Sequence, residues 1–106
     1  PASWQPAKAA LQFSAGAIDK VTDEEILTAY QMITAQEGIF VEPASAAALA
    51  GIIKLQNAGK IDEGSIVVAT MTGHGLKDPD NAVEHANVEA TTVEPNLDSV
   101  RAAIGL

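Results

Sequence analysis

The feature that most constrains this chain is an apolar run that stops at a small hydroxyl residue and a glycine turn. Residues 65–71 read Ser-Ile-Val-Val-Ala-Thr-Met, and Thr72 follows directly, ahead of Gly73 and Gly75. A short apolar run rich in β-branched side chains is typical of a strand buried on both faces of a parallel sheet. Ligands of such sheets bind at the carboxyl ends of the strands. The sequence therefore predicts a central parallel strand at 65–71 that delivers Thr72 into a site.

Helices are predicted to alternate with strands along the chain. Apolar spacing and glycine or proline punctuation predict helices at 4–15, 22–36 and 43–57, a short helix opening at 78–80, and a last helix from 95 to about 105. Strands are expected at 17–21, 39–41 and 65–71, and a loose segment at 87–94. Gly16 and Gly59 are expected to end two of the helices in the left-handed conformation. This alternation predicts an α/β fold, with a parallel-strand sheet and helices packed on it.

Two helix starts carry specific signals. Thr22 and Glu25 stand in the spacing of a capping box, in which each side chain satisfies a free backbone amide at the helix start. Pro43 suits the first position of the following helix, where no amide donor is needed. The 43–57 segment is rich in alanine on most faces, so we expect a buried helix that packs closely.

Composition narrows the classes of function. Among 106 residues, 14 are acidic and 6 are basic, and the net charge of −8 disfavours nucleic-acid and membrane-surface partners. The apolar share of 47% suffices for one small domain, and the absence of cysteine suits a reducing cytoplasm. The longest apolar stretch, 44–53, is shorter than the roughly 20 residues that cross a bilayer. Because Pro1 opens the chain without an initiator Met or a signal peptide, we expect a cut piece of a longer protein.

Several side chains allow both a structural and a functional interpretation. Thr72 either caps a turn or meets a ligand, and Gly73 either permits a tight turn or lets a ligand approach the backbone. Glu42 stands just before a helix and either caps it or contributes a carboxylate to a site. Ser45 either caps the same helix or touches the site, and capping is its expected role. His74 is a candidate general base, although an exposed hydrogen-bonding role is the more common one for a lone loop histidine. No pattern indicates a metal site.

Two motifs together resemble a known family. Residues 37–47 read Glu-Gly-Ile-Phe-Val-Glu-Pro-Ala-Ser-Ala-Ala, and residues 72–79 read Thr-Gly-His-Gly-Leu-Lys-Asp-Pro. In this order and spacing they resemble the C-terminal part of the threonine synthases, pyridoxal 5'-phosphate enzymes of the tryptophan-synthase-β-like fold, known as fold type II. The resemblance implies that residues 1–106 are the C-terminal segment of a large, three-layer cofactor-binding domain. It also implies a full-length cytoplasmic homodimer that converts O-phosphohomoserine and water to threonine and phosphate.

The resemblance assigns cofactor-binding roles to a few residues. It implies that Thr72 lies beside the pyridine nitrogen of the cofactor, with Gly73 and Glu42 also close to it. Lys77 is not the imine-forming lysine, because in the family that lysine stands in an Asn-Pro-Thr-x-Ser-Phe-Lys-Asp context that this sequence lacks. A glycine-rich loop for the cofactor phosphate is missing too. We therefore expect no catalytic residue in these 106 residues and no activity of the chain by itself.

Two alternatives remain open at this stage. The first is a segment of another fold type II enzyme, such as a threonine or serine dehydratase, although the 72–79 motif argues against it. The second is a small non-catalytic α/β binding module, which would need a complete core of its own. Visible absorption after addition of pyridoxal phosphate would separate an imine-forming enzyme from such a module.

Overall fold

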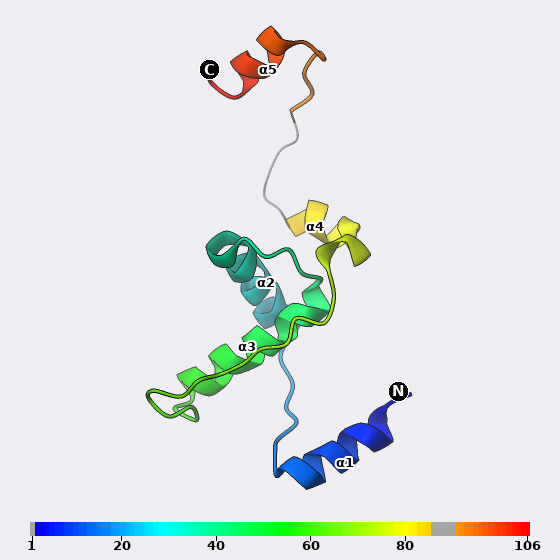
Figure 1. Cartoon of the computed structure of the whole chain (residues 1–106), viewed down its shortest axis with the longest axis vertical. Coiled ribbons are helices and arrows are strands. Elements are labelled where there is room, and N and C mark those ends of the chain that lie inside the picture. Colours follow the sequence, from blue (N-terminus) through cyan, green and yellow to red (C-terminus); the bar gives the residue numbers. More distant parts are fainter. Residues whose placement is uncertain (1, 86–90) are drawn as a thin grey trace.

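The computed structural model describes residues 2–85 and 91–106, and these are mostly helical (Figure 1). The irregular segment expected at 87–94 lies partly outside the described residues. The elements in chain order are α1 (Trp4–Ser14), α2 (Asp23–Glu37), α3 (Pro43–Asn57), the 3₁₀ turn η1 (Gly75–Lys77), α4 (Pro79–His85) and α5 (Leu97–Ala103). No helix in these two ranges is long and apolar enough to cross a membrane.

The predicted start of α2 is confirmed. The Glu25 amide donates to Thr22 Oγ1 at 3.2 Å, and the Thr22 amide donates to Glu25 Oε2 at 2.7 Å. Both bonds satisfy donors that the first helical turn leaves free, so the capping box fixes where α2 begins. At the other end Gly38 has a φ of 66° and donates its amide to Thr34 O at 3.2 Å, which closes the helix.

The predicted bounds of α3 are also confirmed, whereas α1 ends differently from expectation. Pro43 is the first residue of α3, and Gly59 beyond its end takes the left-handed conformation with a φ of 65°. After α1 the left-handed residue is Ala15, with a φ of 52°, and not Gly16. The helix stops at Ser14, whose Oγ accepts the Gly16 amide at 3.2 Å. That local bond gives the Gly16 amide an acceptor outside the helix. It fits the end of α1 at Ser14, one residue earlier than the sequence predicts.

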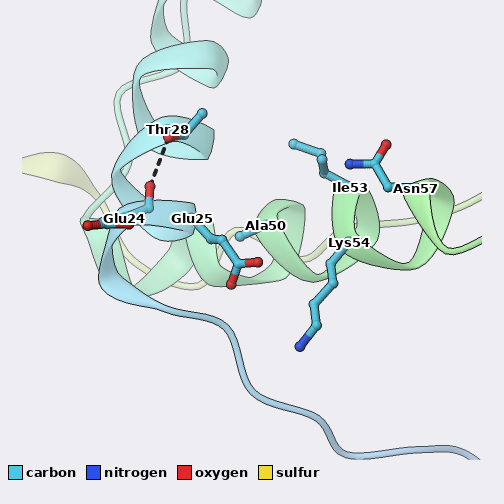
Figure 2. A pocket seen from close by; sticks show the side chains of 7 residues that line it. All are labelled: Glu24, Glu25, Thr28, Ala50, Ile53, Lys54 and Asn57. Carbon is cyan, nitrogen blue, oxygen red and sulfur yellow. Dashed lines mark hydrogen bonds between the residues drawn. The ribbon is translucent and has the colours of Figure 1, made fainter.

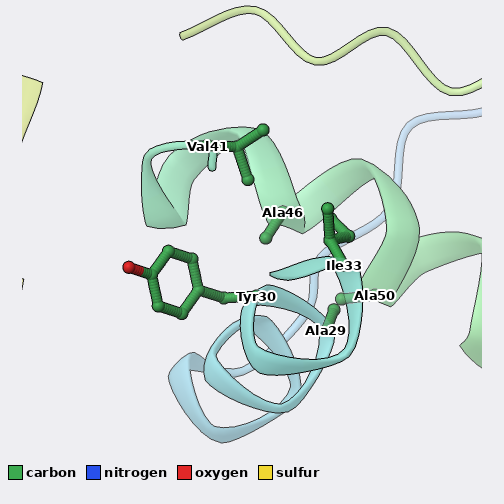
Figure 3. Packing of buried hydrophobic residues seen from close by; sticks show 6 residues of the cluster. All are labelled: Ala29, Tyr30, Ile33, Val41, Ala46 and Ala50. Atoms are coloured by element: carbon green, nitrogen blue, oxygen red, sulfur yellow. The ribbon is translucent and has the colours of Figure 1, made fainter. Parts of the chain in front are cut away.

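The hydrophobic core lies where α2 packs against α3. Its buried members are mostly small or branched side chains: Ala29, Tyr30, Ile33, Val41, Ala46 and Ala50 (Figure 3). Alanines from both helices meet in it, and side chains that small let helix backbones approach closely. Neither α1 nor α5 has a buried residue. The Cα radius of gyration is 18.8 Å, against ~13 Å for a compact domain of about 100 residues. The buried core is thus confined to the centre of the molecule.

The predicted strands do not form in the described part of the chain. Residues 65–71 are extended and run back along α3 (Figure 1), but Val67 is 47% exposed and Val68 is 85% exposed. Segment 17–21 is also irregular, and 39–41 contributes a single antiparallel bridge from Val41 to His74. For this chain the prediction of a strand at 65–71 buried on both faces is therefore wrong. The physical reason is that a parallel strand needs extended neighbours to hydrogen-bond with, and among the described residues only the helix α3 lies alongside, whose backbone groups are bonded within the helix.

Candidate functional site

The two motifs identified in the sequence meet in space. The Glu42 amide donates to Gly73 O at 3.0 Å, and the Gly75 amide donates to Phe40 O at 3.2 Å. These paired bonds join the segment before α3 to the segment before η1, and the Val41–His74 bridge lies between them. The paired positions are more than 30 residues apart in the sequence. Residues 40–45 and 72–77 thereby form one compact unit, which we call the corner.

Ser45 is the buried polar residue of this corner. It is only 2% exposed, and its Oγ accepts the Gly73 amide at 2.7 Å. The same oxygen lies 3.1 Å from Thr72 Oγ1 and 3.3 Å from Gly73 O. The expected capping role of Ser45 is wrong, because the residue lies inside the first turn of α3 and its hydroxyl faces the 72–73 loop.

The sequence contained a signal for this role that the capping interpretation passed over. Helical side chains lean toward the N-terminus of their helix, so a residue in the first turn projects toward whatever lies before that turn. Ser45 follows Pro43 closely, and here the 72–73 loop lies in that direction. Sequence spacing alone does not reveal that loop, because the contact spans 28 residues.

Glu42 makes an ion pair instead of a side-chain cap. It is the residue before α3, yet its side chain makes no capping hydrogen bond. Lys77 Nζ lies 3.1 Å from Glu42 Oε1 and 3.1 Å from Oε2, so the ammonium contacts both oxygens. The Glu42 side chain is 17% exposed and that of Lys77 is 63% exposed. The pair therefore neutralises a largely covered carboxylate at the edge of the corner and ties η1 to the start of α3.

Gly73 and Gly75 stand where no side chain fits. A Cβ on Gly73 would overlap the Glu42 carboxylate, and a Cβ on Gly75 would overlap the Phe40 ring. Both glycines are buried, and neither has a positive φ. Close approach of two segments, and not an unusual turn, is the reason for glycine at these positions.

His74 has the hydrogen-bonding role. Its Nδ1 accepts the Leu76 amide at 3.1 Å and so caps η1, and its ring meets the Phe40 ring edge-on with centroids 5.6 Å apart. Accepting that bond commits the Nδ1 lone pair. The geometry thus supports the structural interpretation of His74 over the general-base one.

A separate hollow of about 240 Å³ lies between the N-terminal part of α2 and α3 (Figure 2). Glu24, Glu25, Thr28, Ala50, Ile53, Lys54 and Asn57 line it. Two of its charged groups already have partners: Glu25 accepts the Thr22 amide, and Lys54 Nζ lies 3.5 Å from Asp19 Oδ2. None of the lining residues belongs to the 40–45 or 72–77 corner, so the hollow is distinct from the candidate site.

Comparison with protein families places the chain in a class. The family described as "Pyridoxal-phosphate dependent enzyme" matches residues 2–73, which is more than half of the chain. The chain belongs to this family. The match covers both the start of α3 and Thr72.

Particular relatives narrow the class further. Over 95% of its length the chain is 46% identical to a threonine synthase of a Bacillus species. It is 54% identical over 79% of its length to a threonine synthase of Mycobacterium leprae, and 45% identical over 99% to one of Synechocystis. The chain spans 29%, 23% and 27% of the lengths of these relatives. The resemblance to threonine synthases drawn from the two motifs is therefore confirmed.

The hydrogen-bonding groups of the corner are compatible with the pyridine end of pyridoxal phosphate, the cofactor of the family. Thr72 is exposed, and within the described residues its hydroxyl hydrogen-bonds to one side chain, that of Ser45. The nearby carboxylate of Glu42 is engaged by Lys77. A neutral hydroxyl is therefore the group offered to a ligand, which suits an unprotonated aromatic nitrogen as acceptor.

Proposed function

We propose that this chain is the C-terminal segment of the large domain of a threonine synthase. The full-length enzyme would convert O-phosphohomoserine and water to threonine and phosphate. The observation that carries the proposal is the exposed Thr72 hydroxyl, backed by buried Ser45 at the junction of the two motifs. Family membership and the identity to threonine synthases support the choice of reaction.

The proposed role of Thr72 is to donate a hydrogen bond to the pyridine nitrogen. When bound, pyridoxal phosphate withdraws electrons from the amino-acid substrate, which permits proton removal and loss of the phosphate group. A hydroxyl partner leaves the ring nitrogen unprotonated, whereas a carboxylate partner would hold it protonated. Gly73 would lie close to the ring, its missing Cβ leaves room for the Glu42 carboxylate, and Glu42, held by Lys77, would form part of the wall.

The larger assembly is part of the same proposal. In the full-length enzyme, residues 65–71 would pair with parallel neighbours and complete a three-layer α/β domain. Their β-branched composition and their present exposure support this. We extend the proposal to a homodimer in the cytoplasm without nucleic-acid or membrane partners, on the basis of the family resemblance and the net charge of −8.

Substitution of Thr72 in the full-length enzyme tests the proposal. Thr72→Val removes one hydrogen bond and keeps the shape, so the protein should fold and its affinity for the cofactor should fall by about 2- to 10-fold. Thr72→Asp should protonate the ring nitrogen, change the absorption spectrum of the bound cofactor and redirect the products. Cofactor titration, absorption spectra and product analysis with O-phosphohomoserine measure these effects.

Thr91→Val is a matched control, because it makes the same change at an exposed position outside the corner. It should leave cofactor affinity and spectra unchanged. If Thr72→Val and Thr72→Asp both keep the wild-type spectra and rates, Thr72 is only a turn residue and the proposed function loses its support.

A second prediction concerns the chain by itself. We expect no phosphate release from O-phosphohomoserine by the 106-residue chain with added cofactor, because its sequence holds neither the imine-lysine context nor a phosphate loop. A phosphate assay with the full-length enzyme as positive control measures this. Turnover above the uncatalysed background would contradict the prediction.

A further inference from the structure

Counting donors and acceptors limits where the hydroxyl proton of Ser45 can point. A serine hydroxyl has one proton to donate and two lone pairs. Ser45 Oγ uses a lone pair to accept the Gly73 amide at 2.7 Å, the shortest of its contacts. Its single proton then has two acceptors within reach, Thr72 Oγ1 at 3.1 Å and Gly73 O at 3.3 Å.

The geometry favours Thr72 as the acceptor. Gly73 O already accepts the Glu42 amide at 3.0 Å, and it is the more distant of the two oxygens from Ser45. Thr72 Oγ1 is closer, and Ser45 is its side-chain partner among the described residues. Because Ser45 is 2% exposed, no bulk water competes for its proton.

We propose that Ser45 is a positioning residue that sets the direction of the Thr72 proton. By donating to Thr72 Oγ1, Ser45 occupies a lone pair there and leaves the Thr72 proton free to point outward, away from α3. The bonds then run in one direction, from the Gly73 amide to Ser45, from Ser45 to Thr72, and from Thr72 to its ligand. This inference rests on the proposed function, in which that ligand is the pyridine nitrogen.

The opposite arrangement explains why the direction matters. If Thr72 donated to Ser45, the Ser45 proton would turn to Gly73 O and Thr72 would offer only lone pairs to the ligand. An unprotonated ring nitrogen would then face an acceptor instead of a donor. Ser45, in the first turn of α3, therefore determines whether Thr72 can donate a hydrogen bond to an unprotonated nitrogen, although Ser45 itself touches no ligand.

The test uses the full-length enzyme loaded with pyridoxal phosphate that carries ¹⁵N in its ring. The ¹⁵N chemical shift reports the hydrogen bond to the nitrogen. Ser45→Ala leaves Thr72 its proton but no longer fixes the direction of that proton, so it should move this shift part of the way that Thr72→Val moves it and weaken cofactor binding by less than the roughly 2- to 10-fold expected for Thr72→Val. It should lower kcat with little effect on KM. Ser45→Thr restores the hydroxyl and should recover the wild-type shift.

Ser14→Ala is the matched control. Ser14 also accepts a backbone amide, from Gly16 at 3.2 Å, but it is exposed and is the last residue of α1, a helix that lies apart from α3 (Figure 1). This variant should keep the wild-type ¹⁵N shift.

The outcomes separate the inference from the proposed function. If Thr72→Val leaves the shift unchanged, Thr72 does not bond the nitrogen and the proposed function fails. If Thr72→Val moves the shift but Ser45→Ala does not, the inference alone fails. Should Ser45→Ala not fold, neutron diffraction of the wild-type enzyme decides: a deuteron on the line from Ser45 to Thr72 supports the inference, and one on the line to Gly73 O overturns it.

Discussion

Gly73 shows how one missing side chain holds the corner together. The space that a Cβ would need there is taken by the Glu42 carboxylate, which in turn contacts Lys77. Because the Lys77 side chain is 63% exposed, solvent screens this ion pair and its contribution is at most about 1 kcal/mol, so the ion pair alone does not account for the arrangement. Close approach of the two segments adds to it, because a Cβ on Gly73 would force the Glu42 side chain to move.

We predict that Gly73→Ala destabilises the full-length protein by about 1 kcal/mol, since the Glu42 carboxylate must move away from the new Cβ and its contact with Lys77 is weakened. Chemical denaturation measures the change in the free energy of unfolding. Gly51→Ala in α3 is the control: a Cβ there meets nothing within 4 Å, and alanine favours a helix by about 0.5–1 kcal/mol over glycine. Equal effects of the two substitutions would show that the crowding at Gly73 is not real.

At the scale of elements, the packing of α2 on α3 affects the pKa of Tyr30. This α2 residue is 6% exposed, and burial raises the pKa of its phenol above 10.0, with the Asp78 carboxylate adding to the shift. The unfolded chain therefore loses the phenolic proton at a lower pH than the folded chain. Stability that is fully present below pH 10 is lost as the pH rises through the pKa of the folded state.

Tyr30 is the only tyrosine of the chain, so its phenolate absorption follows this titration directly. We expect the absorption to rise at higher pH in the native chain than in urea, and the free energy of unfolding to fall above pH 10. In Tyr30→Phe this part of the alkaline loss should be absent. A phenol that titrates identically with and without urea would mean that α2 and α3 do not pack in the chain.

At the scale of the whole molecule, a row of apolar side chains faces solvent. Ile66 is 95% exposed and Val68 is 85% exposed, although both are strand-favouring residues. Within the described ranges, no backbone hydrogen bond involves the amides or carbonyls of residues 66–71. Exposure of this kind supports the proposed pairing of residues 65–71 with another segment.

Amide hydrogen exchange tests that pairing. In the 106-residue chain we expect the amides of 66–68 to exchange rapidly, because they donate to no described acceptor. In the full-length protein the proposed parallel neighbours should protect them strongly. The amide of Ala29, inside α2 and fully buried, is the internal control and should be slow in both. Rapid exchange of the amides of 66–68 in the full-length protein would contradict the proposed pairing of this segment in a sheet.

The sequence by itself determined the features that depend on neighbouring residues. The capping box of Thr22 and Glu25, the start of α3 at Pro43 and its end near Gly59 all follow from hydrogen bonds or backbone angles within a few positions. The Thr72 motif was equally visible, and its resemblance to threonine synthases was confirmed by the relatives. Such signals are readable because their physics is local.

Tertiary structure decided what depends on distant segments. Ser45, expected to cap a helix, hydrogen-bonds instead to Thr72 and Gly73. Glu42 forms an ion pair with Lys77, 35 positions away in the sequence. The tertiary structure also left 65–71 unpaired, although the local composition favours a strand. A strand is completed by hydrogen bonds to its neighbours, and a buried hydroxyl is oriented by whichever groups the fold brings near it. Neither kind of partner is encoded in the residues beside it.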